Sequence, residues 1–116
     1  MSQPAQIHAQ ELHQRITAGE HCALIDVRTA EEYRALHAEG ALLLPLDECT
    51  PDALAQCLTD AGHGSDAPIY FICHTGRRAT EAAEGVFDRF PQATVVQGGT
   101  LAWAQAGLPV KPGSEV

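Results

Sequence analysis

The amino-acid sequence predicts an α/β fold in which helices cover both faces of a mostly parallel sheet. Short, nearly unbroken apolar runs, of which 22–27 and 68–73 are the clearest, are typical of strands buried on both faces. Segments with helical spacing of apolar residues lie between these runs. Strands that alternate with helices in this way imply right-handed crossovers and parallel pairing.

In the first half of the chain, Ala9, Leu12 and Ile16 recur at helical spacing before Gly19, which predicts a helix over 9–18. A strand follows over 22–27. Thr29, with Glu32 three residues later, forms a capping-box pattern that predicts a short helix over 30–37. A shorter apolar piece over 41–46 predicts a brief strand. Neither of these last two elements is long.

The second half repeats the alternation more clearly. Thr50-Pro51 supplies an N-cap and a first-turn proline for a helix that carries Leu54, Cys57 and Leu58. A strand is expected over 68–73 and another over 93–97, followed by a turn at 98–99 and a last helix over 100–106. The clearest periodic signal is a helix from position 79, with apolar residues at 79, 82, 83, 86, 87 and 90.

Length and charge narrow the classes of function. The 116 residues suit one domain, expected over 1–116, and the formal net charge of −8 with only seven basic residues opposes binding to nucleic acid. The longest apolar stretches are about six residues, whereas a membrane-spanning helix needs roughly 20. The N-terminal residues lack the pattern of a signal peptide. We therefore expect a soluble, cytoplasmic protein without a membrane partner.

Cysteine and histidine spacing gives no sign of a metal site. Cys22, Cys49, Cys57 and Cys73 form no C-x-x-C pair, and the six histidines are scattered singly. Free thiols are the expected state of the cysteines where no secretory signal is seen. No metal or organic cofactor is expected.

The segment from Cys73 to Arg78 is the candidate active site. Cys73 ends a predicted buried strand just before a helix, where open α/β sheets place their ligands. Gly76 gives the freedom that a tight loop needs, and the amides of such a loop, together with the helix dipole, attract anions. Such amides favour a thiolate, and Arg77 and Arg78 add positive charge that would hold an anionic substrate. The alternative is that Cys73 is a small buried hydrophobic residue beside two solvated arginines.

Three separated motifs resemble those of the rhodanese-like sulfurtransferases. The loop CHTGRRA fits the C-x-x-G-x-R pattern of that family, while LIDVRTAEEYRALHAEGALLLP and VVQGGTLAWAQAGLPV resemble its Asp-x-Arg segment and its C-terminal signature. The resemblance covers roughly residues 6 to 111. It implies a three-layer α/β/α domain with a sheet of about five strands.

The resemblance also implies a sulfur relay. Cys73 would attack the outer sulfur of a small anionic donor such as thiosulfate, become a persulfide, and pass the sulfur to cyanide or to a thiol, including a protein thiol. Arg78 matches the loop arginine of the family and is assigned with Cys73 to catalysis. The remaining loop residues are assigned to substrate binding: His74, Thr75, Gly76 and Arg77.

Two other functions remain as alternatives. Phosphatases and arsenate reductases on the same fold use C-x5-R, which would require arginine at Ala79, one residue beyond Arg78. A non-catalytic regulatory module would typically lack Cys73. Outside the loop, Asp26 and Arg28 are interpreted as an ion pair or backbone contact that braces the loop after the strand. Glu31 and Glu32 are interpreted as first-turn carboxylates, and Trp103 as a core or rim residue.

Overall fold

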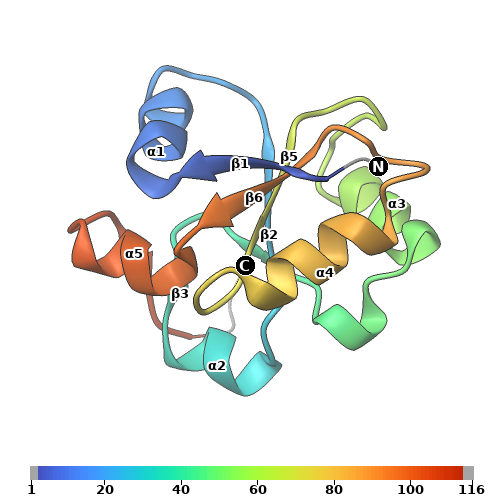
Figure 1. Ribbon diagram of the computed structural model, residues 1–116. Coiled ribbons are helices and arrows are strands. Elements are labelled where there is room, and N and C mark those ends of the chain that lie inside the picture. Colours follow the sequence, from blue (N-terminus) through green and yellow to red (C-terminus); the bar gives the residue numbers. More distant parts are fainter. Residues whose placement is uncertain (1–2, 114–116) are drawn as a thin grey trace.

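The computed structural model describes residues 3–113, and within that range the chain folds around one parallel sheet (Figure 1). The strands lie in the order β1-β6-β5-β2-β4, and every neighbouring pair is parallel. Their bounds are Ala5–His8 for β1, Ala23–Asp26 for β2, Leu42–Leu43 for β4, Ile69–Ile72 for β5 and Ala93–Gln97 for β6. The expected α/β fold with a parallel sheet of five strands is confirmed. The two ends of the expected 1–116 domain, residues 1–2 and 114–116, lie outside the described residues.

Helices cover both faces of this sheet (Figure 1). Their bounds are Ala9–Thr17 for α1, Ala30–Ala35 for α2, Pro51–Asp60 for α3, Arg77–Gly85 for α4 and Gly99–Gln105 for α5. Helices α3 and α4 pack on one face, over side chains such as Phe71, and the other helices pack on the opposite face, over side chains such as Tyr70. All residues of β2 and β5 are buried, which explains the unbroken apolar runs of the sequence.

The helix starts follow the local signals. The Thr29 hydroxyl accepts a hydrogen bond from the Glu32 N–H, and the Glu32 carboxylate accepts one from the Thr29 N–H, so the predicted capping box is present. The Thr50 hydroxyl accepts a hydrogen bond from the Ala53 N–H, with Pro51 in the first turn. Two predicted N-termini are thus confirmed by their caps.

The helix expected over 30–37 was predicted too long. It ends at Ala35, because Leu36 is extended and its carbonyl accepts a hydrogen bond of 2.6 Å from the Arg28 guanidinium. The next two residues form β3 (His37–Ala38), which pairs antiparallel with β7 (Val110–Lys111). A contact between distant parts of the chain therefore overrides the local helical preference.

Other elements also differ from the sequence prediction. The strand expected over 41–46 is limited to β4, and a 3₁₀ turn, η1, occupies Leu46–Glu48. Helix α4 begins two residues before position 79 and ends at Gly85, although Phe90 is still buried after it. Strand β1 was not predicted, because Ile7 is its only buried residue and no apolar run marks it. Within residues 3–113, no helix is both long and apolar enough to cross a membrane.

Candidate active site

The Cys73 thiol lies directly after β5, at the carboxyl edge of the sheet. The residue is 1% exposed and borders the apolar core beneath α3 and α4. Its Sγ nevertheless has a polar partner, because the Gly76 N–H donates a hydrogen bond to it over 3.0 Å. The side chain is therefore buried, as the structural alternative required, and also held by the loop, as the catalytic interpretation required.

The turn from β5 into α4 leaves further backbone donors near this sulfur. Gly76, the N-cap of α4, has a φ of 125°, a value that residues with a side chain rarely adopt. It has no side chain to cap the helix. Within residues 3–113, the N–H groups of Arg77 and Arg78 have no hydrogen-bond acceptor. The positive end of α4 thus carries unpaired donors one and two residues after the amide that contacts Sγ.

Helix α5 supports the same loop from behind. The N–H of Thr100 donates to the Cys73 carbonyl over 2.7 Å, and the N–H of Leu101 donates to the His74 carbonyl over 3.1 Å. This approach requires glycine at position 99, since a Cβ there would lie 2.4 Å from the Cys73 oxygen and 2.5 Å from the His74 oxygen. Sequence analysis identified only a turn at 98–99 and missed this support.

Arg78 is tied to α2 rather than free. Its guanidinium donates two hydrogen bonds to the Glu32 carboxylate, over 2.7 and 3.1 Å. This pairing with Arg78 lowers the pKa of Glu32 to about 2. Glu32 thus has two roles, as helix cap and as partner of the loop arginine, and the sequence indicated only the first. Nothing in the spacing of the two residues, 46 positions apart, could have indicated the second.

Arg77 has a different environment from its neighbour. Its side chain is exposed and forms no ion pair with the described residues. His74 and Thr75 are also exposed. Behind them, the Thr80 hydroxyl donates to the Gly76 carbonyl over 2.8 Å and so holds the peptide that follows the N–H in contact with Sγ. The loop therefore presents one unpaired cation to solvent while its backbone is held from inside.

The expected ion pair between Asp26 and Arg28 is confirmed. The guanidinium donates to both carboxylate oxygens, over 2.9 to 3.2 Å, and the Arg28 N–H donates to the Asp26 Oδ1. Both residues are buried. Their charges are used inside the protein, which agrees with a bracing role rather than with contact to a substrate.

Among the described residues, the other cysteines accept no hydrogen bond from the loop amides. Cys22, Cys49 and Cys57 are partly buried free thiols, and burial raises the pKa of each, to about 11 for Cys49. A raised pKa keeps a thiol protonated and unreactive at neutral pH. Among the described residues, no group of three or more histidine, cysteine or carboxylate side chains is arranged to hold a metal ion.

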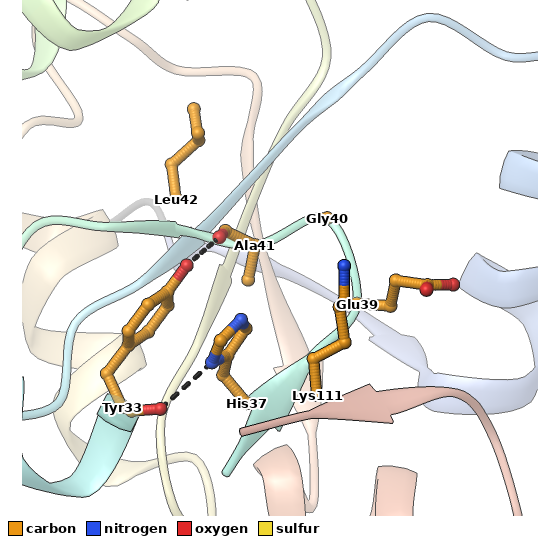
Figure 2. Close-up of a pocket in the computed structure, with 7 residues that line it drawn as sticks. All are labelled: Tyr33, His37, Glu39, Gly40, Ala41, Leu42 and Lys111. Atoms are coloured by element: carbon orange, nitrogen blue, oxygen red, sulfur yellow. Dashed lines mark hydrogen bonds between the residues drawn. The ribbon is translucent and has the colours of Figure 1, made fainter. Parts of the chain in front are cut away.

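A hollow of about 290 Å³ lies beside β3, and none of the predicted site residues lines it (Figure 2). Two of its lining residues are held by contacts within the chain: the His37 ring stacks on Tyr33 at 3.7 Å, and its Nδ1 donates to the Tyr33 carbonyl over 2.9 Å. The Tyr33 hydroxyl donates to the Ala41 carbonyl. These contacts give His37, after the Asp-x-Arg segment, a structural role.

The fold and the loop define a class of α/β proteins that hold a cysteine at a strand-to-helix turn of a parallel sheet. The model of the rhodanese-like domain matches residues 8–106, and the chain therefore belongs to the rhodanese-like family. The resemblance inferred from the sequence is confirmed.

Two relatives illustrate the range of the family. A probable adenylyltransferase/sulfurtransferase of Mycobacterium tuberculosis, MoeZ, is 33% identical over 109 residues, which cover 89% of this chain and 25% of that protein. An HTH-type transcriptional regulator of the same organism is 37% identical over 108 residues, covering 91% of this chain and 44% of the regulator. Both relatives are thus much longer than this chain.

Among solved structures, a thiosulfate sulfurtransferase of Pseudomonas aeruginosa superposes with a TM-score of 0.83 at 18% identity, covering 96% of this chain and 21% of that one. At this level of identity the likeness concerns the fold alone. It confirms the arrangement of helices around the sheet.

Proposed function

We propose that this protein is a sulfurtransferase of the rhodanese type, which moves a sulfane sulfur from a small anionic donor, such as thiosulfate, to cyanide or a thiol. The observation that carries the proposal is the hydrogen bond from the Gly76 N–H to Cys73 Sγ, at the uncapped N-terminus of α4. Backbone donors in this position stabilise a thiolate and the negative charge of a persulfide. The family to which the chain belongs supports the same reaction.

In the first half of the proposed reaction, the Cys73 thiolate attacks the outer sulfur of thiosulfate. A sulfur–sulfur bond forms to Sγ, the sulfur–sulfur bond of the donor breaks, and sulfite leaves with the electron pair. Because Cys73 is 1% exposed, the donor must present a terminal sulfur atom, which a small anion can do. Arg77, exposed and without an ion pair among the described residues, is the cation available to attract that anion.

In the second half, the acceptor attacks the outer sulfur of the persulfide. Cyanide leaves as thiocyanate and a thiol leaves as a persulfide, and the electron pair of the broken bond returns to Cys73 Sγ. Dividing one transfer into two displacements lowers the barrier of each. Both halves are displacements at the transferred sulfur, so the reaction needs no external oxidant or reductant. It uses no metal or organic cofactor. We include a cytoplasmic location in the proposal, since free cysteines suit a reducing compartment.

Intact-mass spectrometry after incubation with thiosulfate tests the proposal. We expect one added sulfur atom in the wild-type protein, which cyanide or dithiothreitol removes, and none in Cys73→Ser. Thiosulfate:cyanide activity should disappear in the same variant while its circular dichroism stays unchanged. An unmodified wild-type mass, or full activity in Cys73→Ser, would refute the assignment. A parallel assay with a phosphate ester tests the phosphatase alternative.

A further inference from the structure

A hollow of about 230 Å³ lies beside the active loop, at the edge of the sheet that β1 forms. Its lining reaches the loop at Thr75, Gly76 and Arg77 but does not include Cys73. The other lining residues come from the start of α4, from β1 and from the end of β6: Thr80, Gln6, Val95, Gln97 and Gly98. The hollow is therefore next to the sulfur site and separate from it.

The lining combines apolar surface with polar side chains and one positive charge. Arg77 offers a guanidinium that no described carboxylate neutralises, and guanidinium groups bind carboxylates through two parallel hydrogen bonds. The carboxamides of Gln6 and Gln97 are exposed and offer both donors and acceptors. The two glutamines lie on the same face of the sheet, since Gln6 is opposite Val95 in the pairing of β1 with β6 and Gln97 is two residues further along β6.

Hydrogen bonds through Gly76 connect the wall of the hollow with the reacting sulfur. Thr80, in its wall, donates to the Gly76 carbonyl over 2.8 Å, and the N–H of the same Gly76 donates to Cys73 Sγ over 3.0 Å. Gly76 therefore lines the hollow and also contacts Sγ. The donor does not need this space, because the sulfonate of thiosulfate is only one sulfur–sulfur bond, about 2 Å, from the atom that is transferred.

We infer that this hollow binds the carboxylate end of the sulfur acceptor, a thiol of amino-acid or short-peptide size, with Arg77 on the carboxylate and Gln6 and Gln97 on its polar backbone. The inference rests on the proposed sulfurtransferase function. The volume is below the roughly 300 Å³ at which pockets for drug-sized ligands begin, so it suits a small acceptor. The acceptor thiol attacks the outer sulfur of the Cys73 persulfide, the electron pair returns to Sγ, and the acceptor proton ends on the transferred sulfur.

Two thiols of similar size and opposite charge test this subsite: 3-mercaptopropionate, which has a carboxylate, and cysteamine, which has an amine. With thiosulfate as donor, the ratio of kcat/KM for 3-mercaptopropionate to that for cysteamine should exceed one in the wild type. We expect the ratio to fall about tenfold in Arg77→Ala and about threefold in Gln97→Ala, with partial recovery in Arg77→Lys. Gln14→Ala, an exposed glutamine on α1, is the matched control and should leave the ratio unchanged.

The outcomes separate the two proposals. If intact mass shows the added sulfur but Arg77→Ala changes kcat/KM for both thiols by the same factor, the acceptor subsite is wrong and the sulfurtransferase function stands. If the wild type gains no sulfur from thiosulfate, the proposed function is wrong and the subsite is overturned with it.

Discussion

Two strand-to-helix turns, from β5 into α4 and from β6 into α5, have similar backbone geometry but use their amides differently. Each helix is entered through a glycine with positive φ, 125° at Gly76 and 79° at Gly98, and neither has a side-chain cap. At α5 the first amides are used inside the protein, on the carbonyls of Cys73 and His74. At α4 one amide contacts a sulfur and the next two have no acceptor among the described residues.

This difference shows that turn geometry alone does not define the active site. The two turns are neighbours because β5 and β6 pair in parallel, which brings their carboxyl ends to the same edge. One turn then supports the other. The supported turn has its carbonyls bound from behind, while its N–H donors stay available for an anion because they lie in the first turn of a helix.

The largest expected effect comes from breaking the support. Gly99→Ala places a Cβ within about 2.5 Å of two backbone atoms, at a φ of 60°, so we expect a loss of about 3 kcal/mol in the free energy of unfolding and loss of most sulfur transfer. Gly107→Ala is the matched control, since its φ is 76° but nothing lies within 4 Å of its Cβ. It should cost about 1 kcal/mol. Urea unfolding measures both, and equal losses would show that the close approach is unimportant.

A smaller effect on stability and a strong effect on activity are expected from Gly76→Ala. Its Cβ would meet nothing closer than 3.9 Å, so only the backbone conformation is strained, by about 1 to 3 kcal/mol. Relaxation of that strain moves the N–H away from Sγ. Loss of one such donor typically lowers kcat by about 10². Thiosulfate:cyanide kinetics check this, and activity within twofold of wild type would contradict the assigned role of the Gly76 amide.

The smallest effect is expected at the tether of Arg78. Glu32→Gln keeps an oxygen for the helix cap but removes the charge, and we expect a loss of about 1 kcal/mol at pH 7, since a pair about one-third exposed is screened by water. In the folded protein the pKa of Glu32 is about 2, below the usual value of 4.5 for a glutamate. The stabilisation is therefore fully present above about pH 4.5 and is lost as the pH falls toward 2.

Denaturant unfolding at several pH values between 7 and 2 measures that acid loss. The free energy of unfolding of the wild type should fall more steeply below pH 4.5 than that of Glu32→Gln. The matched control is Asp52→Asn, which removes the exposed ion pair with Arg89 and should have little effect at any pH. Parallel acid profiles of wild type and Glu32→Gln would show that the pair adds nothing to stability.

The elements that could be predicted from the amino-acid sequence are those whose signals are local. The apolar runs defined β2, β5 and β6, the caps at Thr29 and Thr50 defined the starts of α2 and α3, and the Cys73–Arg78 segment was found from its residue types. Strand burial, capping and loop chemistry depend on residues within a few positions of each other, so their patterns can be seen along the chain.

The contacts between those elements could be seen only in the folded protein. Three strands, β1, β3 and β7, are too short or too exposed to show as an apolar run in the sequence. They are strands only because they pair with distant parts of the chain. The pairing of Arg78 with Glu32 and the approach of Gly99 to the loop join residues that are 46 and about 25 positions apart. Such contacts form because the folded backbone brings their elements together, and no local preference of either residue encodes them.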